Sequence, residues 1–330
     1  MQTLHKLINS LAALLALFIL TSSALAAEPG LPYPASSEIS DQKTGSVLIY
    51  NAYTSAAAPT PTHDTHFSIV NTSQTSAAFV HLFFVDGETC SVADSFICLT
   101  ACQIACFHAS DLDPGVNGYL VAVAVDSNGC PVSHNFLAGS ARVRYGGASN
   151  YEADLGAEAI AALYTGSLPG CTAASVTATV AFDGIAYNRI PRVLMAEPIL
   201  SAADADQLLL INRIGGDLTG SASTIGPIFG ILATDDESKF SFTLRLGTCQ
   251  ARVRPPSIRT APPISSLLTP GRCATLTFWG ASDSVGLLGC LFTITQGTAR
   301  PNPFSSGKNL HKKTLTDDAF YVVPVFPPFC

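Results

Sequence analysis

The chain has 330 residues and a formal net charge of −7, and only 12% of its residues are Asp, Glu, Lys or Arg, while 48% are hydrophobic. A nucleic-acid partner is disfavoured, because binding phosphates needs clustered Lys and Arg. Intrinsic disorder is also disfavoured, because the apolar content is sufficient for a buried core. The composition favours a folded, β-rich, exported protein.

Residues 1–26 have the features of a secretory signal peptide. Lys6 precedes the apolar run 11–20, and Ala24-Leu25-Ala26 supplies small residues for cleavage before Ala27. The run is shorter than the roughly 18 apolar residues that a membrane-spanning helix needs. We therefore expect a cleaved leader, no transmembrane segment afterwards, and a protein that is secreted or held at the cell surface, with the periplasm as an alternative.

All ten cysteines follow this leader, and an even number of cysteines in an exported chain predicts disulfide bonds. Six lie in the first half and four in the second, so that two sets could close independently. The first bond expected joins Cys90 to the nearby Cys98, and Cys330 is expected to be tied back to its own domain. The ten are Cys90, Cys98, Cys102, Cys106, Cys130, Cys171, Cys249, Cys273, Cys290 and Cys330.

Residues 27–44 predict an irregular N-terminal arm, because they are rich in Pro, Ser and Gly. Apolar runs separated by turns then predict an immunoglobulin-like β-sandwich over 45–147. Asn128-Gly129 predicts a type I′ hairpin turn, since both residues accept a positive φ. The expected strands are 46–53, 66–70, 79–85, 103–109, 119–125 and 132–137, the last extending towards Tyr145.

The segment 148–203 is expected to hold one short helix and a linking strand. Apolar residues between Leu155 and Leu163 share one face of a helix over 151–164, and acidic residues lie towards its N-terminal end, where the helix dipole favours them. The linking strand is expected at 176–182.

The second half, 204–330, weakly repeats the first half in the same order. The four matching segments are 208–212 with 67–71, 228–235 with 79–86, 268–279 with 99–109, and 286–292 with 118–124, and a final strand is expected at 319–325. The basic tail 299–314 is interpreted as a solvated loop. The predicted fold is therefore mainly all-β, with two immunoglobulin-like antiparallel β-sandwiches related by a weak internal duplication and one short helix between them.

Two groups of residues have the chemistry of metal ligands. Cys98, Cys102 and Cys106 could hold zinc on a helix, but their spacing and an oxidising compartment favour disulfide bonding. Asp111, Asp113 and Asp126 are weak candidates for a calcium site at one end of the first sandwich. Asp beside Pro or Gly is also common in turns, which is the favoured interpretation.

The histidines point to no shared site. His63 and His66 flank Asp64 at a spacing that could serve a metal, but a solvated loop is favoured because no third ligand is in view. His81 and His108 lie in predicted strands and are expected to be packed or hydrogen-bonded. Asn71 begins a glycosylation sequon, which matters only in a glycosylating host.

No catalytic residue is predicted. The sequence lacks the G-x-S-x-G, H-E-x-x-H, P-loop and G-x-G-x-x-G motifs, and no cofactor is expected. A pair of glycosidase carboxylates stays open, because their proximity is spatial and not sequential.

The segments VHLFFVDGETCSVADSFICLT and GYLVAVAVDSNGCP resemble a family of uncharacterised secreted bacterial proteins that share these words. The resemblance extends over most of the mature chain. It implies export and brings no activity with it, and Cys102 and Cys106 depart from the family pattern.

The function predicted from the sequence is that of an exported, non-enzymatic structural or interaction protein of the cell surface or extracellular space. Its partner would be a cell-surface or extracellular macromolecule, and not a nucleic acid. The alternatives are a secreted hydrolase acting on carbohydrate and a calcium-dependent binding module.

Overall fold

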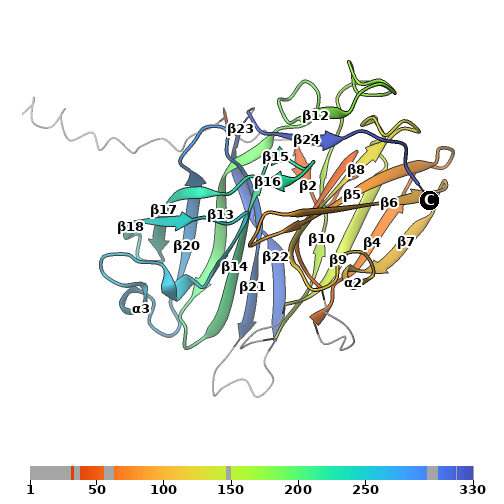
Figure 1. Ribbon diagram of the computed structural model, residues 1–330. Coiled ribbons are helices and arrows are strands. Elements are labelled where there is room, and N and C mark those ends of the chain that lie inside the picture. The colour runs from red at the N-terminus through yellow and green to blue at the C-terminus, as the bar shows by residue number, and fades with distance from the viewer. Residues whose placement is uncertain are drawn as a thin grey trace, which may run out of the picture.

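The computed structural model describes residues 31–32, 38–55, 63–145, 150–295, 304–316 and 318–329. These residues form five small β-sheets with three very short helices (Figure 1). The predicted signal peptide and Cys330 lie outside the described residues.

Sheets 1, 2 and 3 contain most of the first half of the chain and its C-terminal strand. In spatial order, sheet 1 is β2 (Ile39–Ser40), β11 (Glu158–Ile160), β3 (Val47–Thr54), β8 (Asn117–Val125), β5 (Ala78–Asp86) and β6 (Val92–Leu99). Sheet 2 is β10 (Tyr151–Gly156), β9 (Leu137–Tyr145), β4 (His66–Asn71) and β7 (Ile104–His108). Sheet 3 is β12 (Thr177–Ala181), β24 (Phe320–Pro324), β15 (Gly216–Asp217) and β16 (Ser221–Ala222).

Sheets 4 and 5 contain most of the second half. Sheet 4 is β19 (Gln250–Val253), β14 (Ala205–Ile214), β21 (Gly286–Thr295) and β22 (Ser305–Asn309). Sheet 5 is β1 (Leu31–Pro32), β23 (His311–Thr316), β13 (Ile190–Leu200), β20 (Cys273–Gly280), β17 (Gly226–Thr234) and β18 (Lys239–Leu246). The helices are α2 (Ala109–Leu112), η2 (Pro255–Ser257) and α3 (Ile264–Leu267).

Sheet 1 is buried on both of its faces. One face packs Leu82 and Phe84 against Phe67 of sheet 2. The other face packs Val121 against Val180 and Tyr321 of sheet 3. A strand that is covered on both sides needs apolar residues at every position, which explains the continuous apolar runs of β3, β5 and β8.

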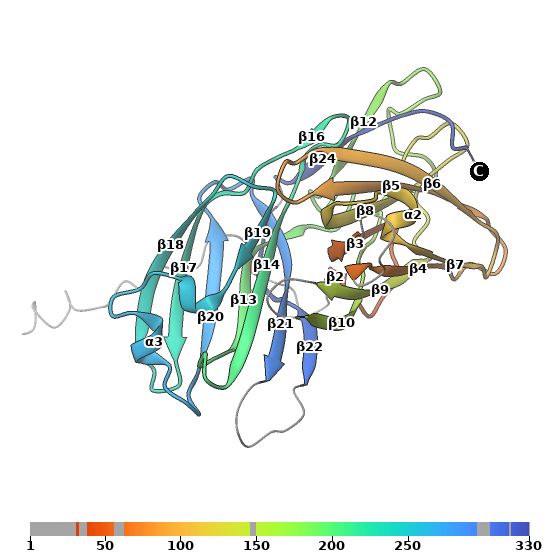
Figure 2. The same ribbon diagram turned by 60° about the horizontal axis from the view of Figure 1, so that its bottom comes forward.

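Sheet 4 is also covered on both faces, and it joins the two halves of the protein. Leu209 and Leu276 belong to the core that it shares with sheet 5. On its other face, the Phe292 ring lies 6.1 Å from that of Tyr145 and 6.0 Å from that of Tyr151, both in sheet 2. In Figure 2 the strands of sheets 4 and 5 lie side by side on the left and those of sheets 1 and 2 on the right.

The prediction of an all-β chain is confirmed, but the prediction of two immunoglobulin-like sandwiches is wrong. The described strands form five small sheets, and sheet 3 combines residues 177–181 of the predicted linking segment with residues 216–222 and 320–324 of the predicted second sandwich. The sandwich prediction fails because the sequence gives no signal for strand pairing over such distances.

The predicted internal duplication is wrong as well, because equivalent strands pair differently. In the first half, β5 pairs with β8. Its proposed counterpart β17 pairs with β18 and β20, whereas β21, the counterpart of β8, pairs with β14 and β22. A duplicated domain would keep its pairings, so the matching segments reflect common strand composition.

The helix predicted over 151–164 is also wrong. Residues 151–156 form β10 and residues 158–160 form β11. Tyr151, Ala153 and Leu155 alternate with more exposed residues, as a strand with one covered face requires. The residues of this segment satisfy both the helical period and the alternating period of a strand. Pairing of β10 with β9 over six residues favours the strand.

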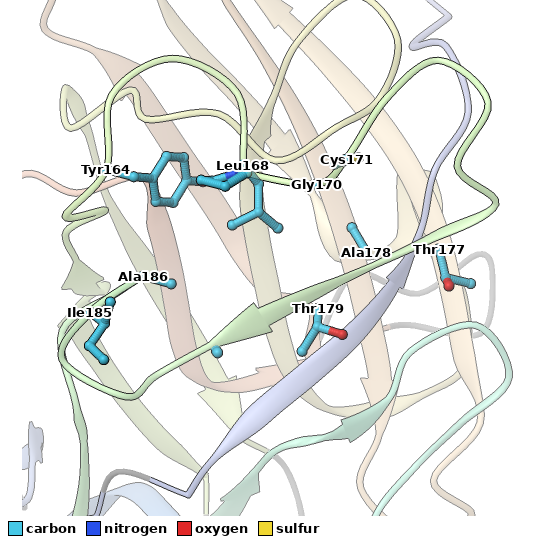
Figure 3. A pocket seen from close by; sticks show the side chains of 11 residues that line it. Tyr164, Leu168, Gly170, Cys171, Thr177, Ala178, Thr179, Ile185 and Ala186 are labelled. Carbon is cyan, nitrogen blue, oxygen red and sulfur yellow. The ribbon is translucent and has the colours of Figure 1, made fainter.

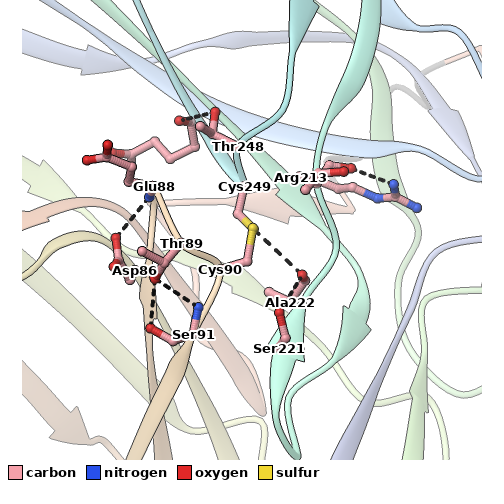
Figure 4. Close-up of a disulfide and its surroundings, with 12 residues drawn as sticks. Asp86, Glu88, Thr89, Cys90, Ser91, Arg213, Ser221, Ala222, Thr248 and Cys249 are labelled. Carbon is pink, nitrogen blue, oxygen red and sulfur yellow. Dashed lines mark hydrogen bonds between the residues drawn. A yellow bond between two sulfur atoms is a disulfide. The ribbon is translucent and has the colours of Figure 1, made fainter.

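A disulfide between Cys90 and Cys249 links the two halves across 159 residues (Figure 4). The expected bond between Cys90 and Cys98 is therefore wrong, and the cysteines do not close in two separate sets. Cys130 is bonded to Cys171, and Cys98 is also in a disulfide.

A buried polar network reinforces the same junction. The Asn212 side chain donates to the Asn51 carbonyl at 2.8 Å, and Gln250 Nε2 donates to Asn212 Oδ1 at 2.9 Å and to the Gly118 carbonyl at 3.0 Å. All three side chains are buried, so each bond removes a desolvation cost that an unpaired amide would carry.

Two further local predictions need correction. Gly129 has a φ of 88°, but Asn128 is not among the described residues with positive φ, so the turn is not of type I′. Its return segment pairs with β8 only through an isolated bridge between Val125 and Pro131, and the next strand, β9, begins at Leu137 and belongs to sheet 2. In the tail, residues 305–309 and 311–316 form β22 and β23 where a solvated loop was predicted.

Candidate functional site

The outward face of sheet 2 is the candidate site. Along β4 and β9, buried residues alternate with exposed ones, so Phe67, Ala141 and Val143 point into the core while the residues between them point outwards. Register brings the outward residues of neighbouring strands side by side. His66 lies opposite His108 of β7 on one side and opposite Arg142 of β9 on the other.

These side chains surround a hollow of about 280 Å³, which we call the sheet 2 hollow. Its lining is entirely ionisable: Asp64, His66, His108, Arg142 and Arg144. The rings of His66 and His108 meet edge to face with their centroids 5.2 Å apart. Most of the exposed wall of the hollow is formed by the carbon atoms of these side chains, and their ionisable groups supply the smaller part.

Asp64 is held in place by Ser110, the second residue of α2. Its Oδ2 accepts a hydrogen bond of 2.5 Å from the Ser110 hydroxyl, and its Oδ1 accepts one of 3.2 Å from the Ser110 backbone N–H. This clamp orients the carboxylate at one rim of the hollow. The carboxylate can still accept further bonds, because two oxygens offer about four lone-pair sites.

The two arginines share a single acidic partner. Arg142 Nη2 lies 2.6 Å from Glu152 Oε1, and Arg144 Nε lies 3.4 Å from the same oxygen. The hydrogen bond from Arg142 holds the pKa of Glu152 below its usual range and raises the pKa of Arg142. Each guanidinium has five N–H donors, so both retain N–H groups that Glu152 does not use.

This arrangement suits a small ligand that carries an acidic group and hydroxyl groups. Guanidinium groups bind carboxylates, sulfates and phosphates with charge-assisted hydrogen bonds. Asp64 accepts from hydroxyls, while the imidazoles of His66 and His108 can both donate and accept. The volume of about 280 Å³ lies just below the usual range for ligand pockets, so a single ring-sized group would fill it.

The weak calcium candidates do not come together. Asp113 precedes β8 and accepts a hydrogen bond of 2.7 Å from the Tyr53 hydroxyl, and burial raises its pKa. Asp126 follows β8 and accepts from Ser167 and from two backbone N–H groups. The nine residues of β8 separate the two by roughly 30 Å, so no ion could bind both. Asp111 bonds to the His108 backbone N–H in the first turn of α2.

The cysteine prediction was wrong for four positions. Cys102, Cys106, Cys273 and Cys290 are free thiols, and of these only Cys290 is buried. Cys98, Cys102 and Cys106 lie in β6, in a turn and in β7, so they form no common stripe. Within the described ranges, no three His, Cys, Asp or Glu residues are arranged to hold a metal ion.

The histidines divide into two kinds. His81 is packed as predicted: it is 1% exposed, and its Nε2 lies 2.9 Å from Asp94 Oδ2. His108 was expected to be packed or hydrogen-bonded, but its side chain is 55% exposed and lines the sheet 2 hollow. His63 is exposed, as the favoured interpretation of a solvated loop expects, whereas His66 belongs to β4 and faces His108.

Asn71 cannot carry a glycan in this fold. It is fully buried, donates to the Ser76 and Thr100 carbonyls, and accepts from the Ser73 backbone N–H. Its Oδ1 also lies 2.9 Å from His134 Nε2. The amide is a structural hydrogen-bonding centre at the end of β4.

The sequence offered one signal for the hollow. His66, Arg142 and Arg144 each occupy an outward position of an alternating strand, where polar residues are expected. Nothing in the sequence paired these strands, so His108, 42 positions after His66, could not be placed beside it.

The described residues also contain no helix that is long and apolar enough to cross a membrane.

Comparison with known proteins identifies no family. No protein-family model matches the chain, and no curated protein matches it significantly. Among solved structures, a β-glucuronidase of Lactobacillus rhamnosus aligns at 9% identity and a TM-score of 0.14, over 81% of this chain and 35% of its own, so the chain spans about a third of that enzyme. A lectin from Pleurotus ostreatus in complex with GalNAc aligns at 11% identity and a TM-score of 0.16, over 92% of this chain and 89% of its own. Scores this low establish no common fold.

Proposed function

We propose that this is an exported, non-enzymatic interaction protein that binds an acidic sugar residue of an extracellular glycan in the sheet 2 hollow. The observation that carries the proposal is the convergence of Arg142, Arg144, His66, His108 and Asp64 on one small open site. The disulfides fit an oxidising, extracellular compartment.

The mixture of groups favours an acidic sugar over a simple anion. An inorganic anion would need donors alone, whereas Asp64 offers acceptors that a ligand with hydroxyl or other hydrogen-bond donors can use. A carboxylate on the same ring would take the free N–H groups of Arg142 and Arg144. One carboxylate in the hollow is also too few for a glycosidase, which needs two acidic side chains flanking the bond that it cleaves.

Titration calorimetry with a trimer of galacturonic acid tests the proposal. The matched control ligand is the same trimer with its carboxylates methyl-esterified, because esterification removes the charge and keeps the ring. We expect the acidic trimer to bind and the ester to bind at least about tenfold more weakly, as the loss of one charge-assisted hydrogen bond predicts.

Variants at the two arginines locate the site. Arg142→Gln and Arg144→Gln should each weaken binding of the acidic trimer by about tenfold, whereas Arg245→Gln, an exposed arginine on β18, should leave it unchanged. Equal binding of trimer and ester, or equal effects of all three variants, would contradict the proposal.

A further inference from the structure

The edge of sheet 3 offers a second, unrelated binding surface. β12 pairs with β24 on one side, and no described strand pairs with its other side. The Val325 N–H donates to the Val176 carbonyl and the Phe182 N–H donates to the Ala319 carbonyl, both at 2.9 Å. In an antiparallel pair the bonded residues alternate, so the residues between Val176 and Phe182 point their backbone groups alternately towards β24 and away from it.

Thr177, Thr179 and Ala181 are the residues whose backbone groups point away from β24. Among the described residues, none is hydrogen-bonded to their N–H or C=O groups. These groups form a row along five residues of β-strand, and a row of this kind is a template for another strand.

The composition of β12 does not protect this edge. Its five residues, TATVA, include no ionisable side chain and no proline. Every other described edge strand of four or more residues contains an ionisable side chain, such as Asp94 in β6, Glu152 in β10 and Lys239 in β18. Charges on edge strands oppose pairing with another chain, and β12 lacks this protection.

A largely apolar cavity of about 510 Å³ lies along the same edge (Figure 3). The loop that carries Tyr164 and Leu168 forms its far wall, and Ile185 and Ala186 close one end. Ile185 is 78% exposed, so an apolar surface faces solvent here. The wall is fixed, because Cys171 is bonded to Cys130 and the Leu168 N–H donates to the Pro131 carbonyl at 2.7 Å.

We propose that the free edge of β12 binds an extended apolar peptide segment of a partner protein, which adds to sheet 3 as a further strand. Its backbone would satisfy the outward groups of Thr177, Thr179 and Ala181, and alternate apolar side chains would enter the cavity. The edge determines the occupant, because only an extended backbone offers donors and acceptors at this repeat. The site is independent of the sheet 2 hollow.

The probe is a fluorescent peptide of seven residues. It has a lysine at each end and alternating threonine and leucine between them, so that all leucines share one face when the peptide is a strand. Two control peptides carry N-methyl groups, one on the leucine amides and the other on the threonine amides. Only one set of amides can face β12, so we expect one N-methylated peptide to bind at least about tenfold more weakly and the other to bind like the parent.

Thr179→Pro tests the position of the site on the full-length protein. It removes an N–H that no described residue uses, and proline is tolerated on edge strands, so the fold should persist. Thr243→Pro is the matched control, because Thr243 lies at an outward, unpaired position of the edge strand β18. Peptide binding should weaken at least about tenfold in Thr179→Pro and remain unchanged in Thr243→Pro.

Several outcomes would overturn the proposal. These are no binding of the parent peptide at millimolar concentration, equal binding of both N-methylated peptides, or unchanged binding in Thr179→Pro. Sedimentation velocity gives one more test: a wild-type dimer that dissociates in Thr179→Pro would mean that a second copy of the chain, and not a partner's peptide, covers this edge.

Discussion

The Cys90–Cys249 disulfide should contribute more to stability than the Cys130–Cys171 disulfide. In the loop-closure model, a disulfide removes entropy from the unfolded chain in proportion to the logarithm of the loop that it closes. Separations of 159 and 41 residues correspond to about 5 and about 4 kcal/mol at 25 °C. The bond that closes the longer loop also joins the turn after β5 of sheet 1 to the residue before β19 of sheet 4, so its loss removes a constraint between the two halves of the unfolded chain.

Urea unfolding of two double variants tests this ranking, followed by circular dichroism and by the fluorescence of the single Trp279. Cys90→Ser with Cys249→Ser should lower the free energy of unfolding by about 5 kcal/mol, which moves the midpoint by roughly 1.5–2 M urea. Cys130→Ser with Cys171→Ser should lower the free energy of unfolding by about 4 kcal/mol, which is about 1 kcal/mol less.

The control is Cys102→Ser with Cys106→Ser, which removes two exposed free thiols and should change stability little. A long-loop variant that is no less stable than the short-loop variant would refute the entropic reasoning. A large loss in the control would show instead that these two cysteines are bonded.

Three further measurements follow from buried groups. Burial lowers the pKa of His81, so the unfolded chain binds more protons than the folded protein as the pH drops from about 7 to about 5. The free energy of unfolding should therefore fall over this range, by up to about 1.4 kcal/mol per pH unit per proton. Urea unfolding at several pH values should show a weaker dependence of this free energy on pH for His81→Phe than for a substitution at exposed His63. Gly129→Ala should destabilise the protein more than Gly166→Ala, because both have positive φ but only at position 129 would a Cβ lie 2.0 Å from a backbone oxygen, as thermal melts would reveal. Thiol titration of the folded protein should modify the three exposed free cysteines quickly and Cys290 only after unfolding, since burial raises its pKa; a fast fourth thiol would contradict this burial.

The strands that the sequence predicted best are those buried on both faces. β3, β5 and β8 consist of nearly continuous apolar residues, and short runs of this kind bounded by turns are typical of strands buried on both faces. Segments with a weaker pattern were ambiguous. Residues 151–160 satisfied both a helical and an alternating period, and only pairing with β9 and β3 decided between them.

Pairing between distant strands could not be predicted, and most of what matters for function depends on it. His66 and His108 meet because β4 and β7 are neighbours, and Cys90 meets Cys249 because β19 approaches the turn that follows β5. Residue types and periods are local properties, whereas register is a property of the whole fold. The candidate site was therefore visible in the sequence only as separate polar positions.

Sheet 3 also determines when folding can be completed. β24 comes from the last described residues of the chain, yet it supplies Tyr321 and Val323 to the core that covers one face of sheet 1. Until residues 320–324 have been synthesised, that face lacks part of its cover, although Val180 and Phe182 of the same core precede them. Contacts between such distant residues slow folding and leave apolar surface open to aggregation. The nascent chain would therefore need protection from association until residues 320–324 have emerged.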